Sequence, residues 1–346
     1  MSAVAFRASV VWCGPGRRVP DGVVVVEGAR VAYAGARRGA PPAAEELEVD
    51  GFLMPAVADR HVHIGLADPG AVLLGGVTAV RDLAWPPDEI FPLADASELA
   101  TFRGPLIRAA GPMLTGPGGY PTKERWAPPG TGRELAGPED AARAVRELQR
   151  RGAAQIKVSL NAVGGPTPTD AELAAIVATA HGLGLPVTAH CEGEGQVARA
   201  VGAGVDELAH APWSERVPDD VVEAAARTQR WVSTLDIHSY GEVTPQLRAA
   251  CENVVRFRAA GGPVVYGTDL GNGPIPPGIH VREALLLQEA VRMSREGVLE
   301  AMTPGPLVPG APADLVAFRA DPLEDLRALA GVVLVVRAGR VVRRAG

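Results

Sequence analysis

Short apolar runs, separated along the chain by helical patterns, are the feature that most restricts how this sequence can fold. Eight runs read as strands, centred on residues 53–60, 77–82, 106–109, 155–158, 186–189, 207–209, 231–235 and 264–267. Strands that alternate with helices form a parallel sheet covered by helices. Eight such units are the layout of a (β/α)8 barrel, and a chain of 346 residues is long enough for one barrel and a small second domain. The sequence therefore predicts an α/β fold of this kind.

Capping signals support the helices between these runs. Thr169 and Glu172 form a T-x-x-E capping box. Apolar residues at helical spacing follow, and Gly182 and Gly184 come before the next apolar run. We expect an amphipathic helix between the capping box and these glycines.

Polar residues end several of the predicted strands. His61 and His63 end the first run, and residues i and i+2 of a strand point to the same face, so both imidazoles can reach one metal ion. Four later runs also end in a polar residue: Lys157, His190, His210 and Asp269. Active sites of such barrels lie at the carboxyl ends of the strands, so these residues are predicted to share one site. Imidazoles with a carboxylate suit zinc best, and Mn, Fe or Co remain open.

The segments that contain these residues resemble the amidohydrolase superfamily, metal-dependent hydrolases built on a distorted TIM barrel. The resemblance covers Gly51 to about Arg340, and it is strongest to the branch holding imidazolonepropionase and the zinc prolidases. It lies in the pair Ile156-Lys157, in TAH at 188–190 with ELAH at 207–210, in GTD at 267–269, and in PADLVAFRADPLEDL at 312–326.

The resemblance implies a role for each strand-end residue. The implied metal ligands are His61, His63, Lys157, His190, His210 and Asp269. An ammonium group cannot bind a cation, but in relatives the amine at the Lys157 position has reacted with CO2, giving a carbamate that bridges two metals. Asp269 would also be the proton shuttle. A single metal with an unmodified Lys157 is the alternative.

Five further residues are candidate substrate contacts. Tyr120 and Glu192 stand at or near positions that face the substrate in relatives, where a histidine is common; Glu192 would favour a cationic group, and Tyr120 could bind a carbonyl oxygen. His238 follows the seventh strand and could line the same pocket. Arg81 and Arg108 come at the ends of the second and third strands and could bind a carboxylate with two hydrogen bonds. Solvated loop positions and structural ion pairs are the alternatives.

The two ends of the chain have a different sequence pattern: runs of β-branched residues, typical of strands, alternate with glycine-rich breaks. The resemblance implies that residues 1–54 and 305–346 pair into one small β-sandwich domain, beside a catalytic barrel formed by residues 55–304. Two unrelated hairpins that cap the barrel are the alternative.

Charge and cysteine content restrict partners and location. The net charge is −6, with 34 basic and 40 acidic residues, which argues against nucleic acid or an anionic membrane as the main partner. Three scattered cysteines, and the lack of a signal-peptide pattern or an 18-residue apolar run, predict a cytoplasmic protein. We expect a small-molecule substrate, and a homo-oligomer is compatible with the sequence.

These expectations combine into a predicted function: hydrolysis of a C–N bond in a dipeptide, an N-acyl amino acid or a cyclic amide. The resemblance implies that metal lowers the pKa of a water molecule, that the hydroxide attacks the carbonyl, and that Asp269 passes the proton to the leaving nitrogen. A mononuclear hydrolase or deaminase acting on a ring C–N bond, and a non-catalytic relative that binds a ligand, are the alternatives.

Overall fold

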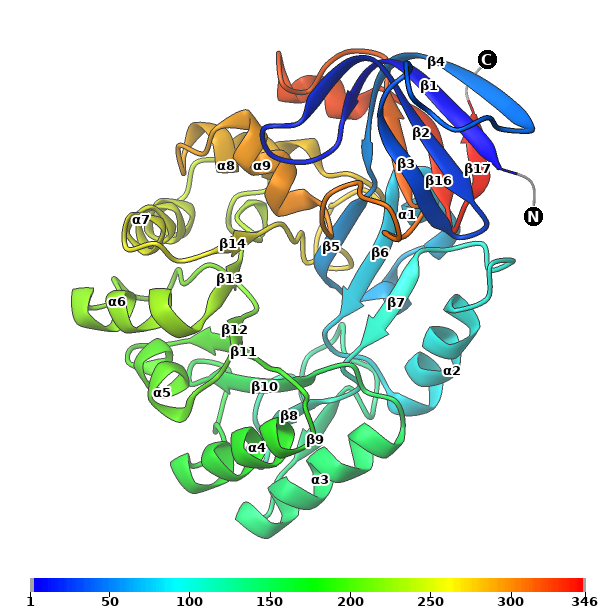
Figure 1. The fold of residues 1–346 in the computed structure, drawn as a ribbon. Helices are drawn as coiled ribbons and strands as arrows, with labels where there is room; N and C mark the ends of the chain where they lie inside the picture. Colours follow the sequence, from blue (N-terminus) through cyan, green and yellow to red (C-terminus); the bar gives the residue numbers. More distant parts are fainter. Residues whose placement is uncertain (1–2, 345–346) are drawn as a thin grey trace.

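Parallel strands from the middle of the chain lie around a centre, with most helices outside them (Figure 1). The computed structural model describes residues 3–344. One sheet has the order β5-β6-β7, from Val57–Val62, Val77–Asp82 and Leu106–Ala109. The other has the order β14-β13-β12-β11-β10-β8-β9, from Val264–Val265, Arg230–Val232, Glu207–Leu208, Val187–Glu192, Ile156–Asn161, Met113–Thr115 and Gly132–Glu134. This part of the molecule is a TIM-barrel-like domain.

Backbone hydrogen bonds connect the two sheets on both sides. Next to β5, the Asp269 N–H donates to the His61 carbonyl oxygen at 2.8 Å. Beyond β7, the Ala154 N–H donates to the Ala109 carbonyl oxygen at 2.9 Å. The first of these contacts joins the segment with the predicted aspartate to the strand with the predicted histidine pair, and so brings the two parts of the motif together.

The helices alternate with the strands as the sequence predicts. They are α1 Pro69–Leu74, α2 Pro87–Ser97, α3 Pro138–Arg150, α4 Asp170–Gly182, α5 Gln196–Ala203, α6 Asp219–Thr228, α7 Pro245–Ala259, α8 Val281–Glu289 and α9 Arg295–Met302. The capping box is confirmed at α4, where the Glu172 N–H donates to Thr169 Oγ1 at 3.2 Å and the Thr169 N–H donates to Glu172 Oε2 at 2.7 Å. In the described part of the chain, no helix has the length and apolar character needed to span a bilayer.

The predicted strand boundaries differ from the observed ones at three places. The first predicted run is divided, because Leu53 lies in β4 (Glu45–Pro55) while β5 begins at Val57. The runs at 231–235 and 264–267 form only the short strands β13 and β14, and their last residues lie outside these strands. The short strands β8 and β9 do not belong to the eight predicted runs.

Strands from both ends of the chain form a third sheet, which also has seven strands. Its order is β17-β16-β15-β4-β1-β2-β3, from Arg340–Arg344, Val332–Arg337, Leu315–Phe318, Glu45–Pro55, Val4–Trp12, Arg18–Glu27 and Arg30–Ala36. Hydrogen bonding makes it one continuous sheet, so we describe it as a sheet domain; the boundaries at residues 54 and 305 remain a prediction. Phe6, Leu53, Leu315 and Leu334 share its buried core.

A glycine in β4 allows the two ends of the chain to approach closely. Gly51 has φ +146°, and a Cβ placed on it would lie 2.1 Å from the Phe318 carbonyl oxygen, so no larger residue fits without movement of the backbone. Because β4 leads into β5 through Ala56 alone, this contact also fixes where the strand with the histidine pair begins.

Candidate active site

A cavity of about 290 Å³ opens among the carboxyl ends of the strands. Its lining residues are His61, His63, Met113, Tyr120, Lys157, His190, Glu192, His210, Trp213, Ile237, His238, Tyr240, Asp269, Asn272 and Gly273. All six predicted metal ligands are among them, with three of the five predicted substrate contacts. The volume lies at the lower end of the range for small-molecule sites, so the cavity suits a small substrate.

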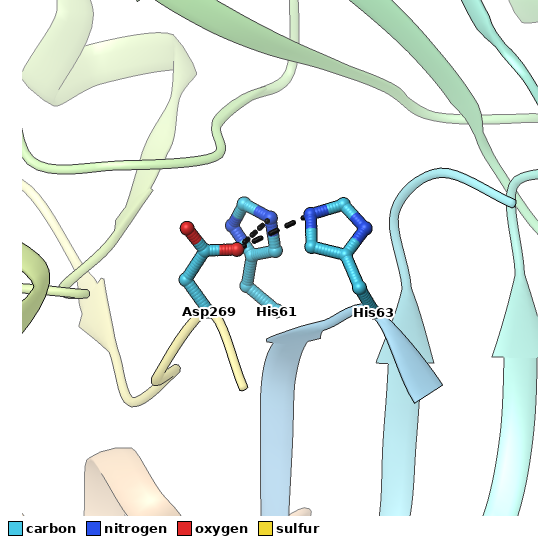
Figure 2. Close-up of side chains that lie close together, drawn as sticks. All are labelled: His61, His63 and Asp269. Carbon is cyan, nitrogen blue, oxygen red and sulfur yellow. Dashed lines mark ion pairs between the residues drawn. The ribbon is translucent and has the colours of Figure 1, made fainter. Parts of the chain in front are cut away.

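Three of the predicted ligands form a tight group, which we call the histidine–aspartate cluster: His61, His63 and Asp269. Asp269 Oδ1 lies 3.2 Å from both His61 Nε2 and His63 Nε2, and Figure 2 shows the two rings pointing at this carboxylate from β5. One potential ligand atom from each residue lies within 4.8 Å of the others, and all three side chains are buried. The arrangement matches the requirement of a metal site for donors that converge on one point.

Backbone carbonyl groups hold the two histidine rings. His61 Nδ1 lies 2.8 Å from the Ala209 carbonyl oxygen, and His63 Nδ1 lies 3.0 Å from that of Ala84. Because a carbonyl can only accept, each Nδ1 donates, and in the neutral ring each Nε2 keeps its lone pair. Metal-binding histidines are commonly oriented by a hydrogen bond of this kind.

A buried aspartate fixes the spacing between the histidine and aspartate segments. Asp59 accepts hydrogen bonds from the His61 N–H at 3.0 Å, the Thr268 N–H at 3.0 Å and Thr268 Oγ1 at 2.5 Å. Burial raises the pKa of Asp59 to about 6, although these hydrogen bonds oppose the rise. The Asp59 side chain therefore joins the backbone of His61 to Thr268, the residue before Asp269.

His190 and His210 lie beside the cluster. The His210 ring centroid is 4.5 Å from that of His61 and 4.8 Å from that of His190. His210 Nδ1 lies 2.9 Å from Thr234 Oγ1, and His190 Nε2 lies 3.3 Å from Asn161 Nδ2. These contacts leave Nε2 of His210 and Nδ1 of His190 as the nitrogens available to a ligand.

Lys157 is fully buried at the same end of the cavity. Its Nζ has no hydrogen-bond partner among residues 3–344. Burial lowers the pKa of Lys157 from 10.5 to about 7, because the charged form loses its hydration. A substantial fraction of the side chain is therefore the neutral amine near neutral pH.

The unpaired polar atoms test whether a metal fits here. His61 Nε2, Asp269 Oδ1 and Lys157 Nζ are all buried and without a hydrogen bond within the described chain. Each such atom costs on the order of 1–3 kcal/mol, so native proteins rarely leave several side by side. Lone pairs and a carboxylate directed at one point fit a divalent cation.

Aromatic side chains and one carboxylate form the side of the cavity. We call Tyr120, Glu192 and Trp213 the pocket wall. Tyr120 stacks on His190 with ring centroids 5.0 Å apart, and Trp213 meets the same imidazole edge-on at 5.6 Å. His238 lies against Trp213 at 4.4 Å, and burial lowers the pKa of His238 to about 4, so it is neutral at pH 7.

Two predicted substrate contacts lie elsewhere, so the prediction for them is corrected. Arg81 donates to Glu207 Oε2 at 2.7 Å inside the barrel-like domain, outside the cavity lining. Arg108 forms an ion pair with Glu98 on the surface. Both side chains already have carboxylate partners from the protein, which removes the reason to expect a substrate carboxylate beside them.

The sequence did not predict six residues that line the cavity, Met113, Trp213, Ile237, Tyr240, Asn272 and Gly273, nor Asn161 and Trp126, which contact His190 and His63. Trp126, whose ring centroid lies 4.7 Å from that of His63, belongs to the glycine- and proline-rich loop at 116–132, where no periodic pattern indicates which side chains turn inward. The tryptophan Trp213 follows His210 closely, and this proximity was the one available signal.

Comparisons with known proteins identify the family of the chain. The model of the amidohydrolase family matches residues 52–342. The chain belongs to the amidohydrolase family. An uncharacterized protein of Mycobacterium tuberculosis (strain H37Rv) is 27% identical over 332 residues, covering 84% of this chain and 85% of that protein.

Two solved structures share the fold of this amidohydrolase. Ochratoxinase of A. niger superposes with a TM-score of 0.84 at 20% identity, covering 99% of this chain and 96% of that one. A Xaa-Pro dipeptidase with methionine bound in its active site also gives 0.84 at 20% identity, covering 99% and 100%. The amidohydrolase membership predicted from the sequence is confirmed, and the chain is a hydrolase that acts on C–N bonds.

Proposed function

We propose that this amidohydrolase uses bound metal to hydrolyse an amide C–N bond in a small substrate. The observation that supports this most strongly is the histidine–aspartate cluster, whose buried donor atoms converge without enough hydrogen-bond partners of their own. A cavity of about 290 Å³ above the cluster leaves room for a small amide.

We propose zinc as the metal, with Mn, Fe or Co able to take its place. The residues that would hold it are His61, His63, His190, His210 and Asp269. Imidazole nitrogens with a carboxylate oxygen are the donor set that zinc prefers in hydrolytic sites. When bound, the ion supplies Lewis acidity: it lowers the pKa of water and polarises a carbonyl group.

Lys157 would complete the ligand set as a carbamate. Its neutral amine adds to CO2, a C–N bond forms, one proton is released, and the product carries one negative charge shared by two oxygens. Burial supports this reaction because it lowers the pKa of the amine to about 7. The Nζ atom also has no hydrogen-bond partner among residues 3–344, so its bonding capacity is unmet on the side of the cavity.

Asp269 would transfer the proton of the reaction. Its Oδ1 faces the cavity between the two histidine rings, while Oδ2 accepts a hydrogen bond from Asn272 Nδ2 at 2.9 Å, which fixes the carboxylate plane. The carboxylate would accept a proton from the attacking water and then donate it to the leaving nitrogen. The left-handed backbone of Asp269, with φ +59°, sets the side chain in this direction.

A mononuclear site is the second candidate. The observation in its favour is that only His61, His63 and Asp269 form a tight ligand group in the described residues. In that case Lys157 stays an amine, and hydrolysis or deamination of a ring C–N bond becomes the expected chemistry. One metal per chain rather than two would favour it.

The proposal includes further expectations from the sequence. We propose that eight strands of the two parallel sheets, β5 to β7 and β10 to β14, act as one closed barrel, supported by the backbone hydrogen bonds between the sheets. We also propose that the sheet domain is an independent unit of residues 1–54 and 305–346, that the enzyme is cytoplasmic and forms homo-oligomers, and that its partner is a small molecule, neither nucleic acid nor membrane.

A hydrolysis screen tests the function. Metal-loaded protein is assayed on N-benzoylglycine, N-benzoylglycinamide and N-(2-aminoethyl)benzamide, which share one amide bond, together with dipeptides and cyclic amides. We expect release of the amine from at least one compound, inhibition by chelator, and loss of turnover in Asp269→Asn. Absence of hydrolysis across the panel, with metal bound, would contradict the proposal.

A further inference from the structure

We propose that the substrate carries a cationic ammonium group near the scissile amide and has no free carboxylate there. The inference rests on the proposed function and narrows its substrate class. Dipeptides with a free C-terminus and N-acyl amino acids, both candidates on sequence grounds, then become poor substrates, while amides with an amino or quaternary ammonium group become good ones.

The charges of the cavity are the first observation. Within the described chain, the lining contains two carboxylates, Glu192 and Asp269; its basic side chains are five histidines and the fully buried Lys157 beside the histidine–aspartate cluster, and no arginine lines it. Proteins that recognise a carboxylate usually offer a guanidinium fork. The two arginines predicted for that role, Arg81 and Arg108, are paired with Glu207 and Glu98 instead.

The position of Glu192 is the second observation. Its Oε2 accepts a hydrogen bond from Asn161 Nδ2 at 2.7 Å and lies 3.6 Å from His190 Nε2. Asn161 Oδ1 in turn accepts from the Val163 N–H at 3.1 Å and the Gly164 N–H at 2.6 Å, so the amide cannot easily turn. One carboxylate oxygen is therefore held, while Oε1 has no partner among residues 3–344 and is free to meet a ligand.

The aromatic rings that line the same cavity as Glu192 are the third observation. Tyr120 and Trp213 lie on two sides of His190, two residues from Glu192, and Tyr240 lines the same cavity. An ammonium group is attracted both by a carboxylate and by the faces of aromatic rings. The pocket wall combines these two attractions, and His238 beside it carries no positive charge at neutral pH that would oppose them.

Binding of an isosteric pair tests the inference without need for turnover. The probes are choline and 3,3-dimethylbutan-1-ol, in which carbon replaces the charged nitrogen. Neither can bind a metal through that centre, and their hydroxyl groups are the same, so any contact with the metal cancels. Calorimetry on the metal-loaded protein should show choline binding about tenfold more tightly than the neutral alcohol.

Two variants locate the effect. Glu192→Gln keeps the acceptor for Asn161 but removes the charge, and it should reduce the choline preference to about two- to threefold, the part owed to the rings. Glu194→Gln is the matched control: it removes the same charge two residues away, on an exposed side chain outside the lining, and should leave the preference unchanged. Equal Kd values for the two probes in wild type, an unchanged preference in Glu192→Gln, or no measurable choline binding would each overturn the inference.

The hydrolysis panel separates this inference from the proposed function. We expect N-(2-aminoethyl)benzamide to be cleaved faster than N-benzoylglycinamide, and N-benzoylglycine slowest. If the enzyme hydrolyses N-benzoylglycine fastest, the proposed function stands and the preference for a cationic substrate is wrong. If the metal-loaded protein cleaves no amide but prefers choline in a way that depends on Glu192, the proposed ligand class stands and the proposed function is wrong.

Discussion

Two groups of charged side chains, each built around a buried carboxylate, lie in the barrel-like domain, and they differ in how that carboxylate is paired. The first, which we call the lower ion cluster, consists of Arg81, Glu207 and Arg230. Glu207 Oε2 accepts from Arg81 Nη2 at 2.7 Å and Arg230 Nε at 2.6 Å, while Oε1 accepts from Thr188 Oγ1 at 3.1 Å. Both oxygens of this fully buried carboxylate are therefore satisfied by the protein itself.

The carboxylate of the histidine–aspartate cluster is also buried, but its hydrogen-bonding capacity is not satisfied. His61 Nε2 and Asp269 Oδ1 have no hydrogen bond within residues 3–344, and neither has the neighbouring Lys157 Nζ. Buried polar groups that lack partners are costly, whereas a paired carboxylate stabilises its surroundings. Within residues 3–344 the lower ion cluster also has one unpaired buried atom, Arg81 Nε, but its carboxylate is fully paired, whereas the carboxylate of the histidine–aspartate cluster is not. This difference separates a structural ion pair from a carboxylate that is arranged for a ligand.

The largest expected effect is on activity, from Asp269→Asn. The amide keeps the shape of the side chain but cannot accept a proton, so kcat/KM on the best substrate of the panel should fall about 10³-fold. The control is Asp206→Asn, a half-exposed residue that forms a surface ion pair with His181. A loss below tenfold, with the control unchanged, would show that Asp269 does not transfer the proton.

Glu207→Ala should have the largest effect on folding. It leaves the partly buried Arg81 without its partner, so the free energy of unfolding should fall by about 3 kcal/mol, measured by urea titration in the presence of chelator. Metal content per folded chain should not change, because no atom of the lower ion cluster faces the cavity. Loss of metal in this variant would remove the distinction between the two clusters.

Thr234→Val should weaken metal binding without removing a ligand. Thr234 Oγ1 is the partner of His210 Nδ1, and loss of such an orienting contact commonly lowers metal affinity by about 10- to 100-fold. Because valine is also β-branched, the left-handed backbone at this position, φ +38°, is equally strained in both proteins. Competition with a chelator measures the affinity, and Thr228→Val on α6 is the control. Equal affinities would mean that His210 needs no orienting group.

The smallest effect, and the clearest contrast, comes from the same substitution made beside the histidine–aspartate cluster, at Lys157, and in the lower ion cluster, at Arg81. Lys157→Met removes an unpaired buried amine, so the metal-free protein should become more stable by about 1–3 kcal/mol, while the metal content falls. Arg81→Met breaks an existing ion pair and should destabilise the protein with its metal retained. If both variants lose stability equally in chelator, Lys157 has a structural partner and the contrast fails.

Most of the site could be predicted because its polar residues lie at the ends of strands. His61, His63, Lys157, His190, His210 and Asp269 each follow an apolar run, and parallel strands bring such positions to one rim. The helix between Thr169 and Gly184 could be predicted as well, because capping and glycine signals are local.

The errors have physical causes that lie outside local patterns. Arg81 ends a strand as His63 does, yet its side chain meets Glu207, which is 126 positions away in the sequence. Strand-end position alone cannot show which side chains have such a distant partner. Trp126 and Trp213 were missed because loops at the cavity have no periodicity that fixes the direction of a side chain.

The most direct test of the account is the metal content of the purified enzyme. Elemental analysis after supplementation with zinc should give one to two metals per chain in wild type and in Glu207→Gln, with a clear loss in His61→Ala and His63→Ala. Chelator should lower the midpoint of thermal unfolding in wild type, since binding of metal to the folded state stabilises it. Less than about 0.2 metal per chain in wild type, with stability unchanged by chelator, would contradict the central claim that the unpaired atoms of this cluster are metal ligands.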